Sequence, residues 1–115
     1  MRRGEIRLID LDPARSGEAS KRRPAVIVSN DRANATAERL GRGVVTVVPL
    51  ASNVSRLFAF QTLLPAAATG LRVDSKAQAE QVRAVSVERI GAALGAVPPE
   101  LMLRLDDALR LHLQL

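Results

Sequence analysis

The chain has 115 residues, a length that allows one domain over residues 1–115 and leaves no room for two. It contains no cysteine and one histidine, His112, which excludes disulfides, thiol nucleophiles, paired-histidine catalysis and imidazole-rich zinc sites. Apolar residues make up 47% and charged residues 25% of the sequence, which is typical of a folded globular protein, and the formal net charge is +5.

The first part of the chain predicts two strands joined by a long polar loop. Residues Glu5–Leu11 are mostly apolar, with Arg7 pointing outward, and indicate a strand. Residues 12–23 contain proline, glycine and several basic side chains, a pattern that favours a surface loop. Loops of this length in small domains are often functional. Residues Pro24–Ser29 are again apolar and predict a buried strand.

The middle of the chain predicts two further strands. Residues Arg32–Leu40 indicate a short helical or irregular connection, and the β-branched segment Val44–Leu50 indicates a central strand. A second polar loop follows at Ala51–Arg56. Residues Phe58–Leu64 alternate well enough for a strand, and Pro65–Asp74 form a turn region.

The last third of the chain ends in a predicted helix. Short strands are expected at Ser75–Gln78, Val82–Ser86 and Ala92–Val97. The sequence Pro98-Pro99-Glu100 suits a helix start. One apolar face of that helix is expected to contain Leu101, Leu105, Ala108, Leu109 and His112, with His112 packed or capping. The pattern predicts a mainly β, α+β fold: a small barrel with a C-terminal helix packed on it.

No segment of the chain predicts a membrane span or a secretory signal. The longest apolar stretch, Val44–Ala51, is well short of the roughly 20 residues that a membrane helix needs. The basic opening Met1–Arg7 has no following apolar region of the signal type. We therefore expect a cytoplasmic protein that does not engage a membrane.

The excess positive charge lies in the first half of the chain. Through Phe58, eleven Lys and Arg residues stand against six Asp and Glu, whereas the remainder has six of each. All basic residues except Lys21 and Lys76 are arginines. The forked guanidinium suits phosphate, so this distribution is consistent with nucleic-acid binding. An arginine-rich proteome from a G·C-rich genome would give the same composition.

Three segments of the chain form a pattern that extends from one end to the other. They are the sequence Arg3-Gly4-Glu5-Ile6 leading to Asp10-Leu11-Asp12-Pro13 and Gly17-Glu18; the sequence Arg23-Pro24-Ala25-Val26-Ile27-Val28-Ser29-Asn30-Asp31; and Asp74-Ser75, Glu80-Gln81-Val82-Arg83 and Arg89-Ile90 before the helix. Together, and in this order, they resemble the MazF/PemK family of toxin endoribonucleases.

This resemblance implies an SH3-like barrel of the CcdB/PemK type that forms a homodimer. It also implies cleavage of single-stranded RNA, chiefly messenger RNA, at short sequences without metal or cofactor. The products are then a 2′,3′-cyclic phosphate and a 5′-hydroxyl, and a small MazE-like antitoxin inhibits the enzyme. The composition agrees with the absence of a metal, because no His, Cys or carboxylate cluster has ligand spacing.

The resemblance also assigns candidate catalytic residues. Arg23 matches the family's catalytic arginine, which directly precedes a proline where loop and strand meet. The family's catalytic threonine matches Ala51, and Ser52 follows it. Either Ser52 supplies the hydroxyl from a shifted position, or cleavage depends on Arg23 with less help.

Elementary chemistry gives these residues their roles. Attack of the 2′-OH on phosphorus builds negative charge that a permanently cationic guanidinium at Arg23 can stabilise, while donating toward the leaving oxygen. Because the guanidinium stays protonated at neutral pH, the general base must be another group. Glu18 is the candidate, and an ordinary salt bridge of Glu18 to a neighbouring arginine is the alternative.

Further polar residues are expected to bind the RNA. Ser52, Asn53 and Gln81 offer hydrogen bonds to base edges, and Arg15, Lys21, Arg22 and Arg56 can follow the phosphates. Stacking must be limited or come from arginine, because only Phe58 and Phe60 are aromatic. We expect Phe60 in the core and leave Phe58 open.

Two other functions stay open from the sequence. The CcdB toxins, which poison gyrase by protein contact, share the expected barrel. Because Ala51 occupies the position of the family's catalytic threonine, a non-catalytic toxin of this kind is the second alternative. A regulator that uses the basic loop only to bind RNA is the third alternative. Cleavage of RNA in excess EDTA, and its dependence on Arg23, separates the enzyme from both.

Overall fold

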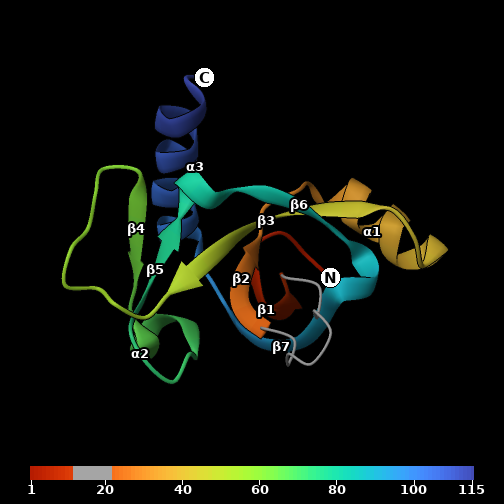
Figure 1. The fold of residues 1–115 in the computed structure, drawn as a ribbon, viewed down its shortest axis with the longest axis horizontal. Helices are drawn as coiled ribbons and strands as arrows, with labels where there is room; N and C mark the ends of the chain where they lie inside the picture. Colours follow the sequence, from red (N-terminus) through yellow and green to blue (C-terminus); the bar gives the residue numbers. More distant parts are fainter. Residues whose placement is uncertain (12–21) are drawn as a thin grey trace, which may run out of the picture.

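Antiparallel strands form the body of the computed structural model, which describes residues 1–11 and 22–115. Within these residues there are seven strands: β1 (Glu5–Asp10), β2 (Arg22–Ile27), β3 (Val44–Ala51), β4 (Gln61–Leu64), β5 (Ser75–Gln78), β6 (Arg83–Ser86) and β7 (Ile90–Ala96). They pair in the order β4-β5-β3-β2-β1-β7, and β6 pairs with the first half of β3. Figure 1 shows β7, β1, β2, β3 and β6 curving round one side of the molecule. The expected mainly β, α+β fold is confirmed.

Helices connect and cover these strands. The α-helices are α1 (Asp31–Leu40), α2 (Ala66–Thr69) and α3 (Pro99–Leu113), and the 3₁₀ turns are η1 (Ala79–Gln81) and η2 (Val87–Arg89). Helix α1 begins at Asn30, whose Oδ1 accepts a hydrogen bond from the amide of Ala33 at 2.8 Å. It ends where Gly41 takes a left-handed conformation. No helix in the described part of the chain is long and apolar enough to cross a membrane.

The alternation of side chains along the strands divides the core into two clusters. In β2, Val26 belongs to a cluster under α3, whereas Ala25 and Ile27 belong to a second cluster that includes Ala37 of α1. The same division occurs in β3, where Val45 and Val47 face the second cluster and Val48 and Leu50 the first. The central strands β2 and β3 are therefore buried on both faces, with successive side chains alternating between the two clusters.

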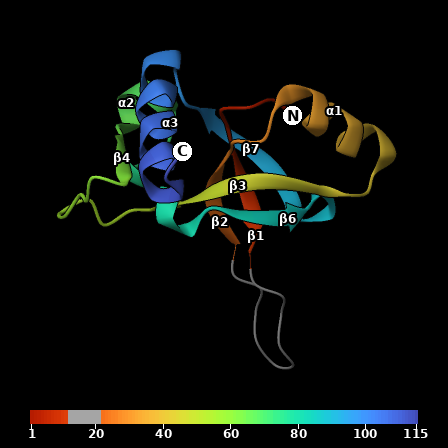
Figure 2. The same ribbon diagram turned by 90° about the horizontal axis from the view of Figure 1, so that it is seen from above.

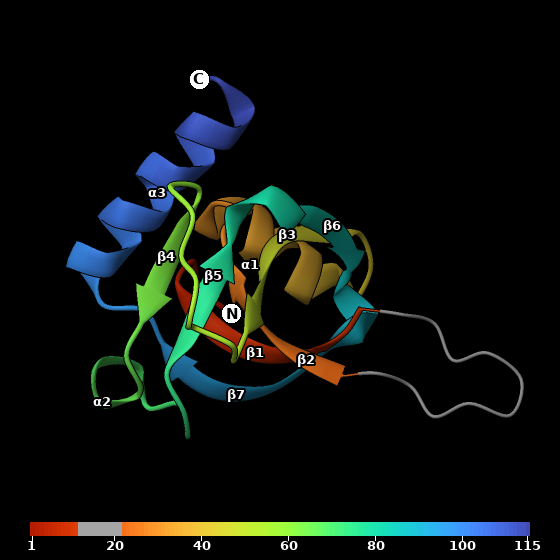
Figure 3. The ribbon, with the colours of Figure 1, turned by 60° about the vertical axis from the view of Figure 1, so that its left-hand side comes forward.

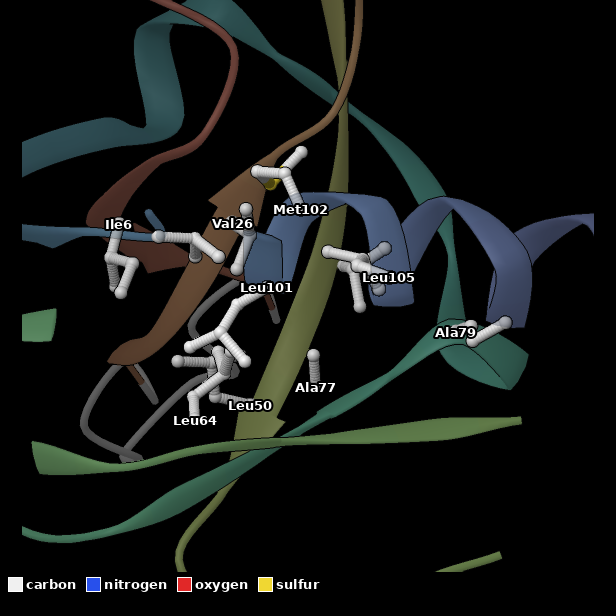
Figure 4. Packing of buried hydrophobic residues seen from close by; sticks show 12 residues of the cluster. Ile6, Val26, Leu50, Leu64, Ala77, Ala79, Leu101, Met102 and Leu105 are labelled. Atoms are coloured by element: carbon white, nitrogen blue, oxygen red, sulfur yellow. The ribbon is translucent and has the colours of Figure 1, made fainter. Parts of the chain in front are cut away.

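Helix α3 packs over β4 and η1 through one apolar stripe (Figure 4). Leu101, Met102, Leu105 and Ala108 are buried, which confirms most of the predicted face. Of the two expectations for His112, packing is wrong because the side chain is exposed, whereas its position in the last turn of α3 leaves the capping role a prediction. The last turns of α3 run beyond the strands (Figures 1 and 3), so nothing covers this end of the stripe among the described residues.

Two element boundaries differ from the sequence prediction in ways that matter for function. Strand β2 begins at Arg22, because Arg22 and Arg23 pair with Asp10 and Ile9 of β1. Strand β4 begins only at Gln61, because the amide of Gln61 donates to the carbonyl of Phe58 and closes a turn. Phe60 is consequently half-buried and belongs to neither core cluster, so its expected core position is wrong.

Candidate functional site

Arg23 lies at the start of β2, where its side chain is exposed and borders two cavities. The next residue, Pro24, has no amide hydrogen and a restricted φ, which suits the first positions of a strand. Cross-strand pairing of Arg23 with Ile9 holds its backbone in the sheet. Its guanidinium is thus attached to a rigid strand and faces open space.

The first cavity has a volume of about 410 Å³ and joins Arg23 to the end of β3. Its lining consists of Arg23, Pro24, Leu50, Ala51, Ser52, Asn53, Val73 and Ser75. Three of the residues predicted from the sequence therefore meet here, from two separate segments. Ala51 is the last residue of β3 and pairs with Lys76 of β5, and the exposed Ser52 follows it directly. Ser52 consequently brings a hydroxyl to the cavity at which Ala51 brings only a methyl group.

Asn53 is held in place by its own local hydrogen bonds. Its Oδ1 accepts from the amide of Ser55 at 3.2 Å and from the Ser55 Oγ at 2.7 Å. This side-chain-to-backbone turn stiffens the polar loop after β3. The amide Nδ2 of Asn53 is the group that this arrangement leaves to donate toward a ligand.

The second cavity, of about 260 Å³, lies beside Arg23 and is mostly polar. It is lined by Leu11, Arg23, Pro49, Gln78, Gln81 and Arg83. Strand β3 lies between β2 and β6, with Pro49 opposite Ala25 and Val47 opposite Arg83. This order brings the two arginines to the same cavity, and the amides of Gln78 and Gln81 add both donors and acceptors.

A third, apolar cavity of about 310 Å³ continues from the first. It shares Pro24, Val73 and Ser75 with it and is completed by Gly70, Leu71, Arg72 and Leu94. Gly95 of β7 permits this arrangement, because a Cβ at that position would collide with the carbonyl oxygen of Thr69 at the end of α2.

The remaining predicted residues lie elsewhere. Glu18, Arg15 and Lys21 fall outside the described residues. Arg22 is exposed on β2 and borders neither cavity of Arg23, and Arg56 lies on the connection between β3 and β4. The candidate site therefore gathers Arg23, Ser52, Asn53 and Gln81 from the predicted set.

Sequence reasoning missed Arg83 and Gln78 as site residues. Arg83 lies two positions after Gln81, at the first residue of β6, and Gln78 ends β5. Both residues lie beside η1, which separates β5 from β6. A polar residue on each side of this interruption was the only sequence signal that could have indicated them as site residues. Their convergence with Arg23 depends on long-range strand pairing.

The charges around the site are basic among the described residues. None of the ion pairs between described residues includes Arg23 or Arg83. A displaced pKa is found away from the site, at Glu38 of α1. The hydrogen bond and the positive charge of the Met1 amino group hold the pKa of that carboxyl below its usual range.

Residues that could hold a metal do not gather in the described part of the chain. No group of three or more His, Asp or Glu side chains comes together over residues 1–11 and 22–115. The dependence of any activity on a metal is therefore a matter for direct test with a chelator.

The sequence and the structure of the chain were compared with those of known proteins to identify its family. The chain is 60% identical over 115 residues to endoribonuclease MazF9 of Mycobacterium tuberculosis, an alignment that covers 100% of this chain and 98% of that protein. The structure superposes on M. tuberculosis toxin MazF-mt6 with a TM-score of 0.76 at 22% identity, covering 96% and 97% of the two chains. It matches a mycobacterial endoribonuclease solved in complex with its cognate antitoxin with a TM-score of 0.75 at 22% identity, covering 100% and 96%. The family model of PemK-like, MazF-like toxins of type II toxin–antitoxin systems matches residues 2–113, and the chain belongs to that family.

Proposed function

We propose that this protein is a toxin endoribonuclease, made of one domain over residues 1–115, that cleaves single-stranded RNA at short sequences. The observation that carries the proposal is the shared cavity of Arg23, Ser52 and Asn53, in a chain that is 60% identical to a named endoribonuclease. A cationic fork, a hydroxyl and an amide around one open cavity suit a phosphodiester and the base beside it.

The proposed reaction needs no group outside the RNA and the protein. The ribose 2′-oxygen attacks the adjacent phosphorus, a new P–O2′ bond forms, and the P–O5′ bond breaks. The 2′-OH proton passes to a base, for which Glu18 is our candidate. Arg23 stabilises the added negative charge on the phosphoryl oxygens and donates a proton to the departing O5′, and the proton that the base took from the 2′-OH returns to Arg23 through solvent. The products are a 2′,3′-cyclic phosphate and a 5′-hydroxyl.

Binding of the RNA strand is assigned to the polar and basic groups around this cavity. Asn53 and Gln81 lie at the two cavities that Arg23 borders, where they can read base edges. Arg15, Lys21, Arg22 and Arg56 are proposed to neutralise phosphates beyond the cut. Neutralisation of phosphates by arginine and lysine makes binding weaker as the salt concentration rises.

A cleavage assay tests the proposed function directly. In excess EDTA, the protein is expected to cut a mixed-sequence single-stranded RNA and to leave a cyclic phosphate on one product. An oligonucleotide with a 2′-deoxy residue at the cut is expected to stay intact, because it lacks the attacking oxygen. Abolition of cleavage by EDTA, or cleavage of the 2′-deoxy substrate, would refute this mechanism.

Substitution of Ser52 tests the source of the hydroxyl at this cavity. Ser52→Ala is expected to lower kcat roughly 10- to 100-fold, the worth of one hydrogen bond to a charged group. Ser52→Thr keeps the hydroxyl and is expected to stay close to the parent rate. An unchanged kcat for Ser52→Ala would leave Arg23 as the principal group of the described site.

We also propose a cognate antitoxin as inhibitor, a homodimer as the active form, and the cytoplasm as the place of action. One solved structural neighbour is described as an endoribonuclease in complex with its cognate antitoxin. The exposed leucines along α3, Leu103, Leu111 and Leu113, are apolar surface of the kind that associating proteins bury. Sedimentation equilibrium of the purified chain measures the oligomeric state.

The methyl group at Ala51 favours one alternative, a toxin or regulator that binds without chemistry. Such a protein would bind a DNA oligonucleotide of the same sequence almost as tightly as RNA, and it would produce no cyclic phosphate. Competition between the two oligonucleotides in the same buffer separates this alternative from the ribonuclease.

A further inference from the structure

Both aromatic side chains of the protein lie together on the connection between β3 and β4. The rings of Phe58 and Phe60 are stacked, with centroids 5.3 Å apart and planes within 7° of each other. The guanidinium carbon of Arg56 lies 5.7 Å from the centroid of the Phe58 ring. We call Arg56, Phe58 and Phe60 the stacking platform.

Neither of the two aromatic rings of this protein is buried in its core. Phenylalanine is normally among the most buried residues, yet the Phe58 side chain is 45% exposed and Phe60 is only half-buried. Both core clusters are built from aliphatic residues and methionine. The rings therefore do not serve the core, and their exposed surface is available to a ligand.

Hydrogen bonds hold the platform in position. The amide of Phe58 donates to the Gln61 Oε1 at 3.2 Å, and the amide of Gln61 donates to the Phe58 carbonyl at 2.9 Å. The Lys76 Nζ donates to the carbonyl of Arg56 at 2.9 Å. A surface that is already ordered loses less entropy when it binds a ligand.

The platform lies on the same connection as two residues of the Arg23 cavity. Ser52 and Asn53, which line that cavity, begin the same connection, and Lys76 directly follows the cavity residue Ser75. Figure 2 shows this connection reaching out from the body of the molecule beside β4. A strand of RNA that leaves the cavity along this connection meets the platform.

The charges on the platform favour RNA over a second copy of this chain. Arg56 is exposed, and Lys76 adds an ammonium group at the same place. Two copies that met at this surface would bring these same cations against one another, whereas RNA brings phosphates. Base–aromatic stacking is stronger than an exposed cation–π contact, so a base can take the place of the Arg56 guanidinium, which then turns toward a phosphate.

We propose that the stacking platform binds one base of the single-stranded RNA substrate outside the cut dinucleotide, by stacking on Phe58. This inference rests on the proposed endoribonuclease function and adds a subsite to it. The platform is a binding element, so its loss weakens the RNA complex and leaves the chemical step intact.

Binding of an uncleavable RNA tests this subsite. The probe is a set of oligonucleotides with a 2′-deoxy residue at the cut and 2-aminopurine at successive flanking positions. We expect fluorescence quenching on binding at one flanking position, and Phe58→Ala is expected to remove that quenching and raise Kd about tenfold. Phe58→Trp keeps an aromatic plane and is expected to retain both the affinity and the quenching.

Leu57→Ala is the matched control, because Leu57 is also 45% exposed and is the adjacent residue of the same connection. It is expected to leave Kd unchanged. An unchanged Kd for Phe58→Ala, an equal loss for Leu57→Ala, or a Phe58→Ala variant that changes oligomeric state instead of affinity would each overturn the proposal. Failure of the proposed function is recognised separately, because the parent protein would then cut no RNA at all.

Discussion

Replacement of Arg23 by alanine is expected to lower kcat for RNA cleavage by about 1,000-fold, close to the loss from removing a preorganised transition-state donor. The reason is geometric. Arg23 is fixed on β2 by pairing with Ile9, and its side chain borders both the cavity with Ser52 and the cavity with Gln81. No other described cation borders both. Single-turnover cleavage of a defined RNA measures the effect.

Two further variants separate charge from geometry at this position. Arg23→Lys keeps a positive charge but loses the planar fork, so it is expected to recover only part of the rate. Arg39→Ala removes the same charge from an exposed position on α1 and is expected to leave kcat unchanged. A folded Arg23→Ala variant that cleaves at the parent rate would exclude Arg23 from the reaction. A similar loss for Arg39→Ala would point to overall charge as the cause.

The sequence predicted the course of β2 from its local pattern, whereas the choice of Arg23 came from the resemblance to the family. A short run rich in β-branched residues after an Arg-Pro pair favours a strand, and its alternation assigns Val26 to one face and Ala25 and Ile27 to the other. The extension of the strand back to Arg22 was missed. Pairing of Arg22 and Arg23 with Asp10 and Ile9 of β1 makes that extension, and local polarity carries no information about this pairing.

The two aromatic residues show a different limit. The hydrophobicity of Phe60 predicts a core position, and the alternation of residues 58–60 predicts a strand. Instead, the hydrogen bond from the Gln61 amide to the Phe58 carbonyl closes a turn over these residues, so they form no strand and Phe60 does not enter the core. The side chain of Gln61 also bonds the Phe58 amide and Glu80, so the geometry depends on a residue 19 positions away.

The candidate site could be predicted in part. Arg23 and Ser52 were assigned by the resemblance to the MazF/PemK family and Asn53 by its hydrogen-bonding groups, and the structure brings all three to one cavity. Arg83 could not be predicted, because its approach to Arg23 requires β3 to pair with β2 on one side and β6 on the other. Helical periodicity predicted that Leu105 and His112 both lie on the packed face of α3, which is correct for Leu105 alone. Periodicity does not indicate where the sheet under the helix ends.

Replacement of Leu105 by alanine is expected to lower the free energy of unfolding by about 2–5 kcal/mol, as large-to-small changes at buried leucines do. Leu105 is fully buried at the centre of α3, in the cluster that contains Ala77 of β5 and Ala79 of η1 (Figure 4). These two members of the cluster are too small to fill the space left by the lost isobutyl group. Because small domains have only about 5–15 kcal/mol of stability in all, the loss is a large share.

Leu103→Ala makes the same chemical change on the same helix, two residues away, at a side chain that is 65% exposed. At protein concentrations low enough to keep the chain monomeric, it is expected to alter the free energy of unfolding by less than about 0.5 kcal/mol. Urea unfolding of both variants at several protein concentrations separates packing within one chain from association between chains. If α3 stabilises the protein by packing on its own sheet, only Leu105→Ala loses free energy of unfolding, and the loss does not depend on protein concentration. Equal losses for both variants that grow on dilution would instead mean that α3 acts mainly in an interface between copies.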